Sequence, residues 1–418
     1  MKPDYKTLQK YPEVQALSNY GFLTRSIRKL ILKSLDDLQY GRLKIIEQDI
    51  TTEVGKGDIL VNAEIKVNDP SFFVDVFTKG SIGAAESYIL KKWDTDDLDN
   101  VMRLFALNKS TLSQVDSGLV NLLKPARLIE YWQDRNTIDG SKKNIKAHYD
   151  LPDELFEHFL DESMMYSSAF FENEESTLEE AQQAKLKLIA ERLDIRAENR
   201  ILEIGSGWGA LAIYLAKNYD CHVTTTTISD NQYRVTKERI AKEGLEDKIT
   251  LLKDDYRLLK GEYDRVVSIE MIEAVGEQFL DSYTQKISDL LVEDGLALLQ
   301  IITINDQEYD RAVKELDFIK KFIFPGSFIP SIHAVLSSFK STSDMRLYNQ
   351  VDFTSHYART LEEWKKRFNT NTHEIPKLGE DEEFIRLWNF YFSYCIGGFH
   401  ERAIGVSHLT FGKPLYRN

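Results

Sequence analysis

Three glycines at alternate positions follow an apolar run and one acid in ILEIGSGWGA, residues 201–210. Glycine lets the backbone pass close to a bound molecule, and the free N–H groups at the start of a helix attract polar or anionic groups. Turns of this kind hold dinucleotides, phosphates or S-adenosylmethionine. The remaining alternative is a turn that serves only strand-to-helix packing.

The residues around the turn discriminate among these ligands. A nicotinamide dinucleotide site has the spacing G-x-G-x-x-G and an acid about 20 residues later, at the end of the second strand. Here the spacing is G-x-G-x-G, formed by Gly205, Gly207 and Gly209. The second predicted strand ends in TTTTIS without an acid, whereas Glu203 precedes the turn, as is usual in S-adenosylmethionine-dependent methyltransferases. In KDDY, Asp255 offers an acceptor for an adenine amino group and Tyr256 a neighbouring ring. The sequence therefore predicts S-adenosylmethionine as the cofactor.

Predicted strands alternate with predicted helices from residue 200 onward. The strands are RILEIGS, CHVTTTTI, ITLLKDD, YDRVVSIEMI and LALLQIITI, and the helices GALAIYLAKNYD, SDNQYRVTKERIAKEGL and GEQFLDSYTQKISDLL. This alternation predicts a mostly parallel sheet with helices on both faces and ligands at the carboxyl ends of the strands. After residue 305, the charged helical segment DQEYDRAVKELDFIKKF and then IFPGSFIPSI interrupt the sheet.

The first part of the chain has a different pattern. Residues 59–67 alternate apolar and polar side chains, as in a half-buried strand. RSIRKLILKSLDDL predicts a helix with basic residues beside an apolar face that consists of Ile27, Leu30, Ile31, Leu35 and Leu38. We therefore predict a small α+β domain at residues 1–120, followed at 121–418 by a methyltransferase domain with helical lid segments.

Composition and charge limit the classes of partner. The net charge of −14 argues against nucleic acid. Cys221 and Cys395 are the two cysteines and lack metal-type spacing, so we expect no metal and a reducing cytoplasm. Residues 1–50 carry nine Lys and Arg against six Asp and Glu, a balance of +3, which leaves −17 for the remainder. The basic helix is either a solvated helix on the domain core or a site that docks on an anionic membrane surface.

The carboxyl-terminal segment FIRLWNFYFSYCIGGFHERA has large apolar side chains at helical spacing. They are Phe384, Leu387, Trp388, Tyr391, Cys395 and Phe399. Such a face is either ordinary core or the wall of a channel for an acyl chain.

Six blocks of sequence, in order, resemble the cyclopropane fatty acid synthase and mycolic acid cyclopropane synthase family. They are KAHYDLPDELFEHFLDESMMYSSAFF, the glycine turn with Trp208, TTISDNQ, VSIEMIEAVG, IFPGSFIPSI and HYARTLEEW. The resemblance covers nearly the whole chain, including GSIGAAESYILKKWDTDDL, which is similar to the amino-terminal domain of the bacterial phospholipid enzymes. It implies a class I, Rossmann-like methyltransferase fold with a seven-stranded sheet, helical insertions and a small amino-terminal α+β domain.

The resemblance also implies an activity, a substrate and a cofactor site. The activity is transfer of a methyl group from S-adenosylmethionine to the double bond of an unsaturated phospholipid acyl chain, which forms a cyclopropane fatty acid. The implied cofactor-binding residues are Tyr149, Tyr166 and Ser167 on the amino-terminal side, Gly205 and Gly207 under the methionine portion, Thr227, Ile228 and Gln232 at the ribose and adenine, and Asp255 and Tyr256 at the base. Read singly, the two tyrosines could instead be core residues and Gln232 a solvated helix residue.

The resemblance further implies a bound bicarbonate as the base, which family members hold with a cysteine-containing loop, a glutamate, a histidine and a tyrosine. The glutamate matches Glu273 and the tyrosine matches Tyr357, and Ile302 is assigned to the same site. In this chain Ser168 stands at the cysteine position and Gln300 at the histidine position. Serine and glutamine can still donate hydrogen bonds to bicarbonate, but glutamine cannot titrate.

These two replacements leave the product open. The default expectation is ring closure, and the alternative is a methyl- or methylene-branched chain or a precursor for a partner enzyme. Two further alternatives are a non-catalytic lipid-binding protein and a methyltransferase for a soluble small molecule. For the leading interpretation we expect a cytoplasmic homodimer, peripheral at the inner membrane surface, with the basic amino-terminal domain facing the bilayer.

Overall fold

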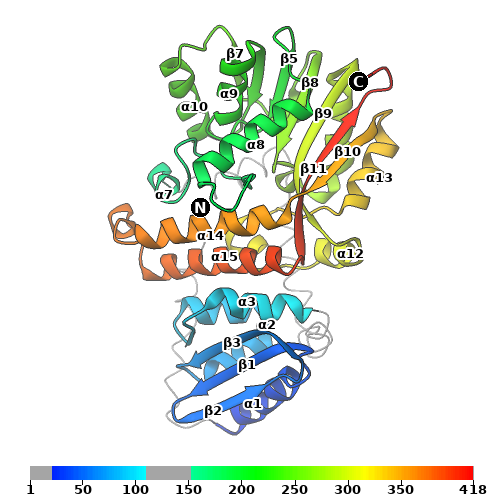
Figure 1. Ribbon diagram of the computed structural model, residues 1–418. Helices are drawn as coiled ribbons and strands as arrows, with labels where there is room; N and C mark the ends of the chain where they lie inside the picture. Colours follow the sequence, from blue (N-terminus) through cyan, green and yellow to red (C-terminus); the bar gives the residue numbers. More distant parts are fainter. Residues whose placement is uncertain (1–20, 110–151, 418) are drawn as a thin grey trace.

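The computed structural model describes residues 21–109 and 152–417 (Figure 1). The chain forms two β-sheets, one in each of these two ranges. The predicted boundary between residues 120 and 121 lies outside the described residues, so the division into domains stays a prediction. None of the helices in the described part of the chain is long and apolar enough to cross a membrane.

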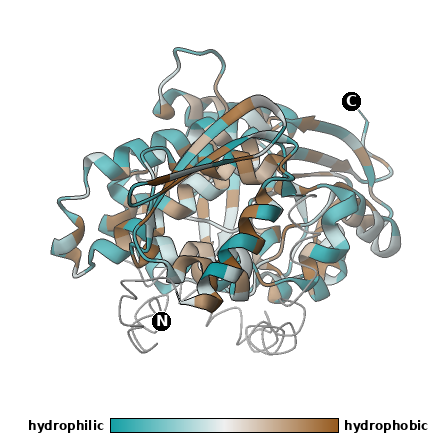
Figure 2. Ribbon diagram, turned by 90° about the horizontal axis from the view of Figure 1, so that it is seen from below, coloured by the Kyte–Doolittle hydropathy of each residue, from teal (hydrophilic) through white to brown (hydrophobic). Residues whose placement is uncertain are grey.

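The amino-terminal unit is a four-stranded sheet with three helices. Its strands are β1 (Tyr40–Glu47), β2 (Ile50–Val54), β3 (Asp58–Val67) and β4 (Trp93–Asp94), and its helices are α1 (Phe22–Leu35), α2 (Ser71–Ile89) and α3 (Leu98–Leu107). The order is β2-β1-β3-β4, with β1 and β3 parallel and the other pairs antiparallel. Figure 2, which views the molecule from this end, shows apolar and polar residues interspersed along these elements. The predicted alternation is confirmed, because Val61, Ala63, Ile65 and Val67 are all buried.

Helix α1 differs from its predicted apolar face at one position. Ile27 and Leu35 are buried, and so is Leu38 just beyond the helix, but Leu30 is 53% exposed. Helical periodicity finds the residues on one side of a helix, but it does not tell which part of that side the rest of the fold covers.

The second unit is built on a seven-stranded sheet, which confirms the predicted fold class. Its strands are β5 (Arg200–Ile204), β6 (His222–Thr226), β7 (Ile249–Leu252), β8 (Tyr263–Ile269), β9 (Leu291–Ile304), β10 (Arg346–Asp352) and β11 (Ile404–Gly412). The order is β10-β11-β9-β8-β5-β6-β7, in which β5 to β9 are mutually parallel and β11 is antiparallel to both of its neighbours, β9 and β10. The strand order reverses between β5 and β8, the place where parallel sheets bind ligands.

Helices and short 3₁₀ turns connect these strands. The helices are α7 (Asp153–Glu157), α8 (Leu178–Arg192), α9 (Ala210–Tyr219), α10 (Asp230–Lys242), α11 (Leu280–Asp289) and α13 (Ile332–Thr342), and the 3₁₀ turns are η2 (Tyr256–Leu258), η3 (Ile272–Ala274) and η4 (Glu277–Phe279). The predicted amino-terminal cap of α10 is confirmed, because the Ser229 side chain accepts a hydrogen bond from the backbone N–H of Gln232.

Two long helices, α14 (Thr354–Thr370) and α15 (Glu382–His400), lie between the seven-stranded sheet and the amino-terminal unit (Figure 1). Trp364 of α14 and Trp388 of α15 are fully buried, and both rings contact Phe159. Helix α15 also packs closely against α3 of the amino-terminal unit. A Cβ atom at Gly397 of α15 would lie 2.8 Å from the carbonyl carbon of Met102 in α3. A tight contact therefore ties the two units together.

The charged segment after β9 is not one continuous helix. It forms α12 (Asp306–Lys314) and then a π-helical turn, η5 (Ile319–Ile323), while η6 (Ile375–Leu378) joins α14 to α15. Glu315 leaves α12 with extended backbone angles, which ends the helix there. The break brings η5 alongside α15, where Phe318 contacts Phe390.

Candidate functional site

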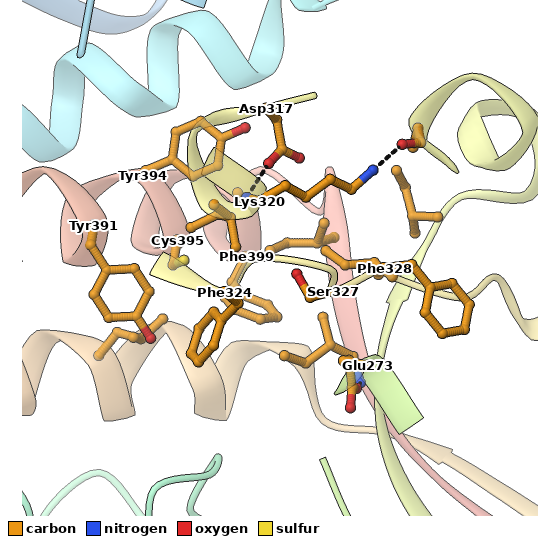
Figure 3. A pocket seen from close by; sticks show the side chains of 18 of the residues that line it. Glu273, Asp317, Lys320, Phe324, Ser327, Phe328, Tyr391, Tyr394, Cys395 and Phe399 are labelled. Atoms are coloured by element: carbon orange, nitrogen blue, oxygen red, sulfur yellow. Dashed lines mark hydrogen bonds between the residues drawn. The ribbon is translucent and has the colours of Figure 1, made fainter. Parts of the chain in front are cut away.

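A mainly apolar cavity of about 770 Å³ extends from the carboxyl ends of the parallel strands to the interior of the amino-terminal unit. Its lining at the sheet includes Glu203, Gly205, Gly207, Thr227, Asp255, Glu270 and Glu273. Its middle is lined by Tyr166, Phe324, Tyr357, Tyr391, Cys395 and Phe399, part of which Figure 3 shows. Its far end is lined by Ile31, Phe72, Phe73, Val76 and Phe77. The volume lies within the range of roughly 300–1,000 Å³ that is common for ligand pockets.

The predicted glycine turn opens into this cavity. Gly205 and Gly207 have φ angles of +99° and +50°, the left-handed region that favours glycine. A Cβ atom at Gly207 would meet nothing within 4 Å, so the chain leaves room for a ligand there. Gly209 has a packing role instead, because a Cβ atom at that position would lie 2.8 Å from the Thr236 side chain on α10.

Glu203 lies near the end of β5, almost fully buried, at the wall of the cavity. The Thr225 hydroxyl on β6 donates to its Oε2 atom at 2.5 Å. Burial raises the pKa of Glu203 to about 8, and the Thr225 hydrogen bond opposes this rise. A carboxylate in this position can accept hydrogen bonds from ligand hydroxyls, and such bonds would favour its ionised form.

The predicted adenine and ribose residues line the same end of the cavity. Thr227 donates from Oγ1 to Oε1 of Gln232 at 2.9 Å, and Ile228 also lines the cavity. The Asp255 carboxylate is paired with Arg257, at 2.7 Å from Nε to Oδ1 and 2.6 Å from Nη2 to Oδ2, which orients it beside the cavity. The backbone N–H of Arg257 also donates to Oδ1, at 3.0 Å, which fixes the orientation of the carboxylate further.

The hydroxyl of Tyr256, the other predicted base-side residue, is buried without a hydrogen-bond partner among the described residues. Such a group costs stability unless a ligand or water satisfies it. Together with the open space at Gly207 and the buried acid Glu203, it makes this end of the cavity fit S-adenosylmethionine.

The amino-terminal side of the predicted cofactor site is partly described. Tyr166 lines the cavity, and its hydroxyl lies 3.0 Å from that of Tyr391. Ser167 also lines it, and its Oγ atom accepts a hydrogen bond from the buried ammonium of Lys185 at 2.7 Å. Burial lowers the pKa of Lys185 to about 8, although nearby Glu270 and Asp161 raise it. Tyr149 lies outside the described residues.

Three of the five residues predicted from the family's base site converge on a carboxylate that the sequence analysis missed, that of Glu270. The backbone N–H of Ser168 donates to Oε1 at 2.9 Å, and Nε2 of Gln300 donates to the same oxygen at 2.6 Å. The Tyr357 hydroxyl donates to Oε2 at 2.7 Å. Three chain segments distant in sequence therefore hold one side chain, which also lines the cavity.

Glu270 has an unusual backbone and charge environment. Its φ angle is +49°, a conformation that costs a non-glycine residue about 1–3 kcal/mol. Burial raises its pKa, while the charge of Lys185 and the hydrogen bonds from Tyr357, Ser168 and Gln300 lower it. The one sequence signal for this residue was its place near the end of the predicted strand YDRVVSIEMI, at the carboxyl end where ligands of parallel sheets lie; the observed strand β8 ends one residue before it.

Gln300 is fully buried on β9 and acts behind Glu270, because it is not part of the cavity wall. Its Oε1 atom lies 2.9 Å from Nε2 of His408, the residue opposite it on β11. Burial and Arg192 hold the pKa of His408 well below its usual range, and Arg192 lies 2.5 Å from Nδ1. Arg192 can only donate, so the neutral ring carries its proton on Nε2 and donates to Gln300. This series of hydrogen bonds fixes the Gln300 amide so that its NH₂ group faces Glu270.

Glu273, the predicted catalytic glutamate, lies beside Glu270 on the cavity wall. Its Oε1 atom accepts a hydrogen bond from the backbone N–H of Ile302 at 2.5 Å. Its Oε2 atom has no hydrogen-bond partner among the described residues. Burial and then the charge of Glu270 raise the pKa of Glu273 to about 8. Two neighbouring carboxyl groups of this kind do not ionise independently, and one of them stays protonated near neutral pH.

The predicted carboxyl-terminal helix contributes both to the core and to the wall of the cavity, and whether that wall holds an acyl chain stays a prediction. Phe384, Leu387 and Trp388 of α15 are core residues. Tyr391, Cys395 and Phe399 line the cavity on the next turns (Figure 3). Burial raises the pKa of the Cys395 thiol, which therefore stays protonated as part of an apolar wall. Within residues 21–109 and 152–417, no cluster of three or more His, Cys, Asp or Glu is arranged to hold a metal ion.

Comparisons with known proteins agree with this geometry. Residues 137–409 match the family model of mycolic acid cyclopropane synthetase. The chain is 36% identical to the cyclopropane-fatty-acyl-phospholipid synthase of Escherichia coli K12 over 363 residues, which are 84% of this chain and 88% of that one. It is 32% identical to the tuberculostearic acid methyltransferase UfaA1 of Mycobacterium tuberculosis over 340 residues, 79% of this chain and 78% of the relative.

A similar fold is found in the crystal structure of the mycolic acid cyclopropane synthase CmaA1 complexed with SAH and CTAB. The TM-score is 0.61 and the sequence identity 30%, over 65% of this chain and 98% of that one. The glycine turn, the buried acid before it and these similarities lead to one assignment. The chain belongs to the cyclopropane synthase family of S-adenosylmethionine-dependent methyltransferases.

Proposed function

We propose that the protein transfers a methyl group from S-adenosylmethionine to the double bond of an unsaturated phospholipid acyl chain and closes a cyclopropane ring. One observation carries the proposal. The glycine turn with Glu203 opens into the same apolar cavity as Glu270 and Glu273, and this cavity continues into the amino-terminal unit. A polar cofactor end, two acids and an apolar extension are what this reaction requires.

The cofactor would be held by the residues at the carboxyl ends of β5 and β6 and in the η2 turn. When bound, S-adenosylmethionine supplies an electrophilic methyl group. Gly207 would give it room, Glu203 would accept hydrogen bonds from its hydroxyls, and Tyr256 would offer a hydroxyl that has no partner among the described residues.

The chain's own side chains suit a reaction that passes through a carbocation. Phe324, Tyr391 and Phe399 line the middle of the cavity and exclude water that would trap the cation (Figure 3). Aromatic faces and a fixed carboxylate stabilise positive charge in such a site. Tyr357 stacks on Phe399, with ring centroids 4.4 Å apart, and so presents its hydroxyl to Glu270 from a fixed position.

The acyl chain would reach the site through the amino-terminal unit, whose α1 and α2 helices contribute to the far end of the cavity. Helix α1 has features of a membrane-docking surface. Phe22 and Leu23 are 89% and 68% exposed, like Leu30, and the basic Arg25, Lys29 and Lys33 are exposed beside them. Exposed apolar side chains with basic neighbours suit an anionic bilayer surface. We therefore expect peripheral association through this face, and a cytoplasmic homodimer remains an expectation from the family.

Expression in a bacterium that lacks its own cyclopropane synthase tests the proposed function. Fatty acid esters would be analysed by gas chromatography and mass spectrometry, after derivatisation that distinguishes a ring from a branch or a double bond. We expect cyclopropane fatty acids. A methyl- or methylene-branched product would show that the protein transfers the methyl group but does not close a ring. A lipid profile identical to that of the host would count against methyl transfer itself.

A further inference from the structure

The groups that would hold a bicarbonate base are already occupied by side chains of this protein. The Ser168 N–H, one N–H of Gln300 and the Tyr357 hydroxyl donate to Glu270. The Ile302 N–H donates to Glu273. We propose that Glu270 is the resident base of the reaction and lies where its relatives would bind bicarbonate. This inference rests on the proposed function.

The other hydrogen-bond donors of Ser168, Gln300 and Tyr357 also have acceptors within the protein. The Ser168 hydroxyl donates to the Ala169 carbonyl at 3.1 Å, and Nε2 of Gln300 lies 3.3 Å from the Ser168 carbonyl. Tyr357 has a single hydroxyl proton, which it gives to Glu270. No donor of this set is therefore left for another anion. An added bicarbonate would also lie beside the Glu270 carboxylate, whose negative charge repels it. The site does not fit bicarbonate.

The proton balance of the reaction needs nothing beyond Glu270. Once the methyl group has bonded to one alkene carbon, the other carbon is left cationic. The Glu270 carboxylate accepts a proton from the transferred methyl group, and the electron pair of that C–H bond closes the ring. Glu270 becomes a neutral carboxylic acid and returns its proton to solvent before the next turnover. No oxidant, reductant or further reactant enters.

The backbone at Glu270 makes a clean test feasible. A φ angle of +49° suits glycine better than glutamate, so Glu270→Gly removes the carboxylate and leaves a vacant anion site without new backbone strain. Glu270→Gln keeps the size and much of the hydrogen bonding but cannot take a proton. Glu277→Gln, at an exposed position of the neighbouring η4 turn, is the matched control.

The experiment measures methyl transfer to vesicles of unsaturated phospholipid in carbon-dioxide-free buffer, with and without 20 mM sodium bicarbonate. We expect the wild type and Glu277→Gln to differ less than twofold between the buffers. The rate of methyl transfer by Glu270→Gln should be at least 100-fold below that of the wild type in both buffers. Glu270→Gly should be as slow without bicarbonate, and its rate should rise at least tenfold when bicarbonate is added. A wild type that bicarbonate stimulates tenfold, or a Glu270→Gln variant that keeps more than a tenth of the activity, would overturn the proposal.

A binding measurement separates this inference from the proposed function. Isothermal titration of bicarbonate into the SAH-saturated full-length protein should give no heat of binding for the wild type and a measurable affinity for Glu270→Gly. Bicarbonate that binds the wild type as tightly as the variant would overturn the proposal whatever the activity. A wild type that binds SAH but methylates no lipid in either buffer would reject the proposed function and the role of Glu270 as its base. The titration would still decide whether Glu270 fills the anion site.

Discussion

The buried carboxyl group of Glu203 should make cofactor binding strongly dependent on pH. Its pKa of about 8 means that the free protein carries mostly the neutral form at pH 6. If bound hydroxyls require the carboxylate, the protein must release this proton on binding. The apparent affinity then rises with pH until the group is ionised in the free protein. For a pKa near 8, the affinity at pH 8 is about 50-fold tighter than at pH 6.

Isothermal titration of SAH at several pH values, in buffers with different ionisation enthalpies, measures both the affinity and the protons released. We expect about one proton released at pH 6.5 and progressively fewer above pH 8. Glu203→Gln should bind SAH more weakly at pH 8 and lose most of this dependence, whereas Glu198→Gln, at an exposed position just before β5, should behave as the wild type. An affinity for wild-type protein that is constant from pH 6 to 8, without proton release, would refute the reasoning.

Three further predictions follow from the hydrogen bond of Tyr357, the packing of Gly397 and the exposed residues of α1. Tyr357→Phe removes a hydrogen bond to Glu270, so turnover should fall about 10- to 100-fold at unchanged SAH affinity in kinetic and titration measurements. Gly397→Ala places a Cβ atom against the α3 backbone and should cost about 1–3 kcal/mol in denaturant unfolding, whereas Gly398→Ala meets only the Ile404 side chain and should cost less. Replacing exposed Phe22, Leu23 and Leu30 by serine should weaken co-sedimentation with anionic vesicles without lowering the melting temperature, and unchanged sedimentation would contradict docking through α1.

Local patterns in the sequence predicted the five parallel strands of the large sheet, whereas the two added strands, β10 and β11, were implied only by the family resemblance. Alternating apolar residues predict β3, and the regular exchange of strands and helices after residue 200 predicts the parallel sheet and the edge at which its ligands lie. The glycine turn could be interpreted because its chemistry is contained in a few consecutive residues. Its place at the cavity follows from the topology, since the carboxyl ends of neighbouring parallel strands share one edge.

The arrangement of the acids could not be obtained in the same way. Glu270 is three residues from Glu273 in the sequence, but its partners come from residues 168, 300 and 357. The orientation of Gln300 depends on His408, which faces it only because β9 and β11 pair in a particular antiparallel register. Such contacts arise from long-range packing, which leaves no periodic signal along the chain. The roles assigned to these residues remain predictions.

Purified protein, S-adenosylmethionine with a trideuterated methyl group and vesicles of unsaturated phospholipid provide the most direct test of methyl transfer and ring closure at this site. Mass spectrometry of the derivatised fatty acids would follow the label. We expect a cyclopropane that retains two of the three deuterium atoms, because a base at the cavity wall removes the third. Unlabelled lipid in the presence of bound cofactor would contradict the proposed function, and a branched chain that keeps all three would contradict ring closure.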